Sequence, residues 1–137
     1  MSTPATILVV DDNHVQRYSV CRTLQMAGFQ VTEAANGNDA LLRIRERPDL
    51  VVLDVRLPDI DGFEVCRRAK ADPELSSVPV VLVSASEQSR SAVSDSVQVG
   101  AFAYLFLPFF AEQLIAVVNG CLARSGAKAT SAQNPRD

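Results

Sequence analysis

The sequence predicts an α/β protein with a doubly wound parallel sheet, and two patterns support this fold class. Short apolar runs such as residues 7–10 and 50–53 end abruptly in acids or turn residues, which is typical of strands buried on both faces. Segments with apolar residues near helical spacing alternate with these runs, so right-handed crossovers must place helices on both faces of the sheet. The chain has 137 residues, 47% of them hydrophobic, which suits one domain with a sizeable core.

Five strands are expected along the chain. Most are dominated by apolar residues, whereas residues 30–34 alternate apolar and polar side chains and are therefore expected near an edge of the sheet. The predicted strands are residues 7–10, 30–34, 50–54, 78–83 and 101–107. Pro108 ends the last of them, because proline lacks the N–H group that strand pairing requires.

Five helices are expected to separate and follow these strands. They cover residues 15–27, 40–44, 63–71, 87–99 and 109–124, and the serine-rich segment 87–99 has the weakest periodicity. Gly28 and Gly100 stand where helix C-caps belong. Small polar residues follow from Ser125, so we expect one domain over residues 1–124 and a disordered tail or the start of a linker over residues 125–137.

The composition excludes several classes of protein. A formal net charge of −3 and a pI near 5.1 argue against direct contact with nucleic acid, which requires a basic surface. Cys21, Cys66 and Cys121 lie far apart in helical segments, as expected for buried free thiols rather than a zinc site or disulfide framework. No apolar run approaches the roughly 20 residues of a membrane span. A cytoplasmic protein without direct membrane contact is expected.

Three acidic residues follow the ends of two predicted strands. Asp11 and Asp12 come after the first strand, and Asp54 closes the third. The carboxyl ends of neighbouring parallel strands form the crevice in which α/β proteins bind ligands, so these carboxylates are expected to converge there. Such a cluster suits Mg²⁺, and a carboxylate beside the ion is a possible nucleophile towards a phosphoryl group, with the hydroxyl of Ser84 within reach. The alternative is that Asp54 is a loop carboxylate that caps the next helix.

Several motifs together resemble the receiver domain of two-component response regulators. The motifs are Val9-Val10-Asp11-Asp12, Asp54 followed by Leu57-Pro58-Asp59-Ile60-Asp61-Gly62, Ser84-Ala85, Gly100-Ala101, and Tyr104-Leu105 before Leu107-Pro108-Phe109. The resemblance covers roughly residues 6–124 in order and register, which is far more than a single motif supplies. It implies a flavodoxin-like sheet with strand order 2-1-3-4-5, flanked by five helices, and a signalling protein rather than an enzyme.

The resemblance also implies a role for each residue of the acidic crevice. Asp54 matches the aspartate that accepts a phosphoryl group from a histidine kinase or a histidine phosphotransfer protein. Asp12 matches the direct Mg²⁺ ligand, and Asp11 matches the ligand that acts partly through water. Arg56 occupies the position whose backbone carbonyl completes the metal shell.

Two further residues match the family's switch. Ser84 corresponds to the hydroxyl that moves to the phosphoryl group, and Tyr104 corresponds to the aromatic whose rotation reports that movement. The resemblance implies that the face formed by the fourth helix, the fifth strand and the fifth helix binds a downstream protein or output domain, or a second copy in a homodimer. For both residues the alternative is an ordinary structural role at a strand end or on a half-buried face.

The chain departs from the family where the last strand ends. In the family, a lysine stands directly before the proline, and a small polar residue usually precedes that lysine. In this chain the two positions hold Leu107 and Phe106. Losing the lysine removes one charge that stabilises phosphoryl transfer, a change that commonly costs a few kcal/mol. Either the guanidinium of Arg56 compensates in part, or the domain is a degenerate receiver that acts as a phosphorylation-independent interaction module. Phe106 and Leu107 then either pack in the core or bind a partner.

An aspartate-nucleophile phosphohydrolase is the nearest enzymatic alternative. Such an enzyme needs a second acid two residues after the nucleophile, to protonate the leaving group. That position holds Arg56, which argues against this class.

Overall fold

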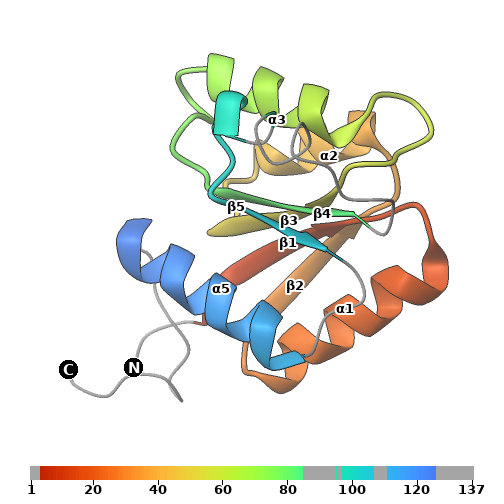
Figure 1. Cartoon of the computed structure of the whole chain (residues 1–137), viewed down its shortest axis with the longest axis vertical. Helices are drawn as coiled ribbons and strands as arrows, with labels where there is room; N and C mark the ends of the chain where they lie inside the picture. The colour runs from red at the N-terminus through yellow and green to blue at the C-terminus, as the bar shows by residue number, and fades with distance from the viewer. Residues whose placement is uncertain (1–3, 85–94, 96, 107–110, 126–137) are drawn as a thin grey trace.

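A five-stranded parallel sheet forms the centre of the molecule (Figure 1). The structure, a computed structural model, describes residues 4–84, 95, 97–106 and 111–125. The strands are β1 (Thr6–Val10), β2 (Gln30–Ala34), β3 (Leu50–Asp54), β4 (Val80–Ser84) and β5 (Ala103–Phe106). Their spatial order, β2-β1-β3-β4-β5, confirms the predicted fold and places the alternating strand β2 at an edge, as expected.

Helices cover both faces of this sheet. They are α1 (His14–Met26), α2 (Gly37–Ile44), α3 (Gly62–Ala71) and α5 (Ala111–Ser125). Figure 1 shows α1 and α5 on one face and α2 and α3 on the other. Each face has its own apolar cluster, because both sides of the central strands are buried.

The predicted boundaries differ from the observed ones at several elements, most at α2, which begins at Gly37 rather than at residue 40. The last two strands begin at Val80 and Ala103, two residues later than expected at each. The last helix ends at Ser125, one residue beyond the predicted end. Most of the predicted helix 87–99 lies outside the described residues, although residues 95, 97 and 98 are helical. The predicted tail beyond Ser125 and the position of Leu107 also lie outside them.

Side-chain caps fix where the helices near the carboxyl ends of the strands begin. Asn13, Asn36 and Asp61 each accept a hydrogen bond from the backbone N–H three residues later, at 2.8, 2.8 and 2.9 Å. Gly28 and Gly100 adopt positive φ angles of 101° and 85°, consistent with the predicted stops after two helical segments. The strand ends and these helix starts therefore gather at one edge of the sheet.

The three cysteines are buried free thiols, as predicted. Cys21 and Cys121 belong to the apolar cluster under α1 and α5, and Cys66 belongs to the cluster under α2 and α3. Burial is the main cause that raises the pKa of each thiol to about 11. The thiols therefore behave as core side chains rather than as nucleophiles.

Candidate functional site

The register of the sheet brings the three predicted carboxylates together. β1 pairs directly with β3, with Val10 opposite Leu53, so Asp11 and Asp54 follow paired residues. Carboxylate oxygens of Asp11, Asp12 and Asp54 all lie within 4.8 Å of one another. Asp11 and Asp54 are only 4% and 7% exposed, whereas Asp12 is exposed to solvent. The cluster is therefore a partly buried acidic crevice that is open on the Asp12 side.

The first turn of α1 holds Asp11 in place. Its carboxylate accepts hydrogen bonds from the backbone N–H of Asn13 at 2.9 Å and from the side-chain amide of Gln16. Its backbone carbonyl accepts a hydrogen bond from the guanidinium of Arg17 at 2.6 Å. Arg17 also pairs with Glu33 of β2 at 2.9 Å, so that the guanidinium ties α1 to the edge strand.

Asp54 is the most strongly perturbed carboxyl in this crevice. Burial, together with the negative charges of Asp11 and Asp12, raises its pKa from an ordinary value of 3.8 to about 7, and the backbone N–H of Arg56 at 3.3 Å opposes this only in part. Within the described part of the chain, no lysine or arginine side chain forms an ion pair with Asp54. Three carboxylates this close to one another fit a hard divalent cation such as Mg²⁺.

The loop after Asp54 is held tightly on both sides. A side chain at Gly62 would lie 2.9 Å from the Cα of Val55 and would overlap the carbonyl oxygen of Asp54, so this position requires glycine. The carboxylate of Asp59 accepts hydrogen bonds from the backbone N–H groups of Gly37 and Asn38, both at 2.8 Å. The loop is thus fastened to the first turn of α2 as well as to the strand end.

The two predicted switch residues lie on the neighbouring strands. Ser84 ends β4 and is fully buried. Tyr104 is half-buried in β5, and its ring lies between Phe63 of α3 and Phe106, with centroid distances of 6.2 and 4.9 Å. Ser84 and Phe106 are direct partners in the β4–β5 register. The side chain of Arg56 is exposed beside the crevice, whereas its backbone N–H contacts Asp54.

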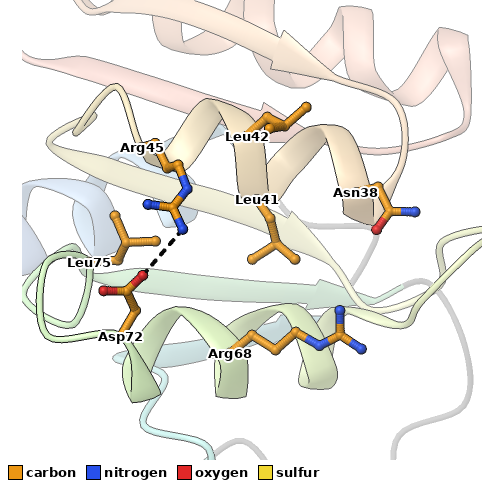
Figure 2. A pocket seen from close by; sticks show the side chains of 7 residues that line it. All are labelled: Asn38, Leu41, Leu42, Arg45, Arg68, Asp72 and Leu75. Atoms are coloured by element: carbon orange, nitrogen blue, oxygen red, sulfur yellow. Dashed lines mark hydrogen bonds and ion pairs between the residues drawn. The ribbon is translucent and has the colours of Figure 1, made fainter.

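A separate groove of about 460 Å³ lies between α2 and α3 (Figure 2). Leu41, Leu42 and Leu75 supply its apolar lining, and Arg45 and Asp72 form an ion pair across it at 3.5 Å. This groove does not include any of the three crevice carboxylates. The acidic crevice, and not this groove, holds the residues whose chemistry the sequence predicts.

Comparison with known proteins agrees with this arrangement. The family model of the response regulator receiver domain matches residues 7–119. The chain belongs to this family. It is a receiver domain of a two-component response regulator, which is a signalling module. Within the described residues, no receiver helix is both long and apolar enough to cross a membrane.

Relatives of two sizes resemble this receiver domain. Protein PilH of Pseudomonas aeruginosa is 37% identical over 120 residues, which cover 87% of the chain and 98% of PilH. Response regulator MprA of Mycolicibacterium vanbaalenii is 38% identical over 123 residues, which cover 89% of the chain but 52% of MprA. The receiver thus spans nearly all of PilH and about half of MprA.

Solved structures share the fold over most of both chains. A putative response regulator from Chloroflexus aurantiacus superimposes with a TM-score of 0.83 at 35% identity, covering 88% of this chain and 99% of the other. Chemotaxis protein CheY4 of Vibrio cholerae gives a TM-score of 0.80 at 31% identity, covering 86% and 98%.

Sequence reasoning did not identify Gln16, Arg17 or Asp59 as supports of the crevice. The signal for Gln16 and Arg17 is their place on the first turn of the helix that follows Asp11 and Asp12, where side chains point back towards the strand end. Asp59 contacts α2 across a gap of more than 20 residues in sequence, so only the tertiary fold reveals its role.

Proposed function

We propose that the receiver accepts a phosphoryl group on Asp54 from the phosphohistidine of a histidine kinase or a histidine phosphotransfer protein. The observation that carries this proposal is the convergence of Asp11, Asp12 and Asp54 at the carboxyl ends of β1 and β3, with Asp54 almost buried. A carboxylate oxygen of Asp54 attacks phosphorus, and the bond from phosphorus to the donor imidazole breaks. The imidazole nitrogen keeps the electron pair of that bond, and Asp54 becomes an acyl phosphate.

Mg²⁺ would be held by Asp12, by Asp54, by Asp11 partly through water, and by the backbone carbonyl of Arg56. The bound ion would neutralise the charge that accumulates on the transferring oxygens. The protein's own contribution is orientation, because the Asn13 N–H and the Gln16 amide hold Asp11 in place. The Arg56 N–H does the same for Asp54.

Ser84 and Tyr104 would report phosphorylation to the surface. The Ser84 hydroxyl would hydrogen-bond to the phosphoryl group, and Tyr104 would respond on β5, the edge strand beside α5 (Figure 1). A downstream protein, an output domain or a second copy would then recognise the face around β5. One relative, RpaA of Synechocystis, of which the chain spans 49%, is a DNA-binding transcriptional regulator, so a DNA-binding output is one candidate class.

We also propose that Arg56 partly replaces the family's lysine, because the position of that lysine holds Leu107 in this chain. Its side chain is exposed two residues beyond Asp54, on the same loop, and a guanidinium forms paired hydrogen bonds with a phosphoryl group. Arg56→Ala should slow acyl phosphate formation or change its lifetime. Unchanged formation and lifetime in this variant would remove Arg56 from the mechanism.

The proposed function is tested by mass spectrometry of the intact protein. Incubation with Mg²⁺ and acetyl phosphate should add one phosphoryl group, which hydroxylamine removes and Asp54→Ala abolishes. Asp72→Ala, which alters a partly exposed carboxylate at the C-terminal end of α3, should leave the modification intact. If neither acetyl phosphate nor a cognate kinase modifies the protein, the alternative of a phosphorylation-independent interaction module stands.

A further inference from the structure

Three aromatic rings form a continuous row between α3 and β5. Phe63 and Tyr104 stack with a centroid distance of 6.2 Å and an angle of 28° between their planes. Tyr104 and Phe106 are tilted by 48°, with centroids 4.9 Å apart. Tyr104 and Phe106 are two residues apart in a strand and so project from the same face of the sheet. We refer to Phe63, Tyr104 and Phe106 as the aromatic row.

One end of the aromatic row adjoins the loop after Asp54, and the other adjoins the end of β4 at Ser84. Phe63 directly follows Gly62, whose backbone packs against the carbonyl of Asp54 and donates a hydrogen bond to Val55 at 2.8 Å. At the other end, Phe106 is the register partner of Ser84. Tyr104 therefore contacts a residue next to the Asp54 loop on one side and a residue paired with the end of β4 on the other.

We propose that Phe63 and Phe106 are positioning residues that hold the ring of Tyr104 in its resting position and so oppose switching. The proposal rests on the proposed function, in which Tyr104 is the switch aromatic. It also gives Phe106 a role that core packing alone does not supply. A bulky aliphatic side chain at this position fills space, whereas only an aromatic ring provides the offset and edge contacts of a ring pair.

A cavity beside the aromatic row offers space for a second position of the Phe63 ring. This cavity of about 340 Å³ is lined by Phe63 together with Arg67, Asp95, Gln98 and Val99. The ring of Phe63 borders this space, and a shift of the ring into it would release one side of Tyr104. The contacts of the aromatic row then favour the resting arrangement, and phosphorylation must overcome them.

The resting position of Tyr104 is tested without any phosphodonor. The chain has two tyrosines, so labelling with 3-fluorotyrosine gives two fluorine NMR resonances, and Tyr18, which is 63% exposed on α1, serves as the internal reference. Phe106→Leu and Phe63→Leu should each move the Tyr104 resonance towards that of Tyr18, because a ring current is lost. Phe106→Tyr keeps an aromatic ring and adds a third fluorine resonance, and the Tyr104 resonance should stay close to its wild-type position.

Phe102→Leu is the matched control. Phe102 lies one residue before β5 and is 40% exposed, and its ring contacts Arg124 rather than the aromatic row. This change should leave the Tyr104 resonance in place. An unmoved resonance in both Phe106→Leu and Phe63→Leu would overturn the proposal. If one variant does not fold, as judged by its thermal melt, the other still decides.

The effect on switching is tested by titrating beryllofluoride, a phosphoryl mimic, in the presence of Mg²⁺. If the aromatic row opposes switching, Phe106→Leu and Phe63→Leu should bind the mimic about 2- to 10-fold more tightly than wild type, and Phe106→Tyr should match wild type. Equal or weaker binding by both leucine variants would overturn the proposal. If wild type and all variants fail to bind the mimic, the proposed function fails instead, while the resonance still decides whether the row holds Tyr104.

Discussion

At the scale of single residues, the ionised carboxylate of Asp54 destabilises the folded state when no cation is bound. Its carboxyl is 7% exposed and lies within 4.8 Å of the carboxylates of Asp11 and Asp12. The native state therefore holds a proton on Asp54 up to about pH 7, whereas the unfolded chain releases it near its ordinary pKa of 3.8. Between these two values the folded protein binds more protons than the unfolded one, so this residue's contribution to stability falls as the pH rises.

Asp54→Asn should remove this pH-dependent loss. The variant is expected to match wild type near pH 4 and to be more stable by roughly 1–3 kcal/mol at pH 8, because the amide carries no charge in either state. Urea unfolding at both pH values without divalent cation measures the difference. Glu74→Gln, the same change at an exposed and loosely paired carboxylate, should show no such gain. A variant no more stable than wild type at pH 8 would contradict the assigned electrostatics.

The positions of the crevice carboxylates were predictable from sequence, whereas their supports were not. Asp11, Asp12 and Asp54 follow apolar strand runs, and parallel strands end at a common edge, so their convergence depends only on topology. The contact of Gln16 with Asp11 depends on side-chain rotamers in the tertiary structure. For Phe106, the two-residue spacing from Tyr104 already places both on one face of the strand, but the contact between their rings depends on side-chain rotamers.

At the scale of elements, two glycines in helices should respond oppositely to the same substitution. Gly62 begins α3 against the backbone of Asp54 and Val55, so Gly62→Ala forces the acceptor loop and the helix apart. In α5, a methyl group added at Gly120 would meet nothing within 4 Å, and alanine there only restricts the unfolded chain. We expect Gly62→Ala to lose about 1–3 kcal/mol and Gly120→Ala to gain about 0.5–1 kcal/mol.

Thermal or chemical melts of the two glycine variants decide this prediction. Gly62→Ala should also slow modification of Asp54 by acetyl phosphate, because the loop is displaced, whereas Gly120→Ala should not. Equal stability of the two variants would show that α3 can shift freely away from the loop.

The attachment of the acceptor loop to α2 should depend on pH. Loss of hydration raises the pKa of Asp59, but the N–H groups of Asn38 and Gly37 outweigh it, so that its pKa lies below the ordinary value. The stabilisation is therefore complete above the unfolded pKa and is lost as the pH falls through the folded pKa. Asp59→Ala should lower the melting temperature more at neutral than at acid pH, with a smaller effect for Asp59→Asn. A pH-independent decrease would argue against these hydrogen bonds.

Element boundaries were less predictable than element types. The apolar run 78–83 is typical of one strand, but the N–H of Val78 bonds to Leu75 in a turn and Pro79 has no N–H, so β4 begins at Val80. Residues 101 and 102 are also apolar, and the N–H of Phe102 bonds to the carbonyl of Val80 at 2.7 Å, yet β5 begins at Ala103. Hydrophobicity marks where a strand passes through the core, but it does not fix the residue at which the strand starts.

At the scale of the whole molecule, α1 presents exposed apolar side chains beside the acidic crevice. Val15 and Tyr18, in the first two turns of this helix, are 75% and 63% exposed. The helix begins two residues after Asp12, so a protein that brings a phosphohistidine to Asp54 must pass close to its first turns. Aromatic side chains at such positions commonly act as anchors in protein interfaces.

Tyr18→Ser should therefore slow phosphorylation by a protein donor without slowing phosphorylation by acetyl phosphate. Loss of one aromatic anchor should slow transfer from a phosphorylated histidine kinase or phosphotransfer protein about tenfold at limiting concentrations, since such anchors contribute roughly 1–2 kcal/mol. Transfer from acetyl phosphate should not change, because Asp54 and its neighbours are untouched. Leu42→Ser, at a 65% exposed position on α2 across the sheet, is the matched control and should alter neither rate. Unchanged transfer from the protein donor in Tyr18→Ser would instead place the donor away from α1.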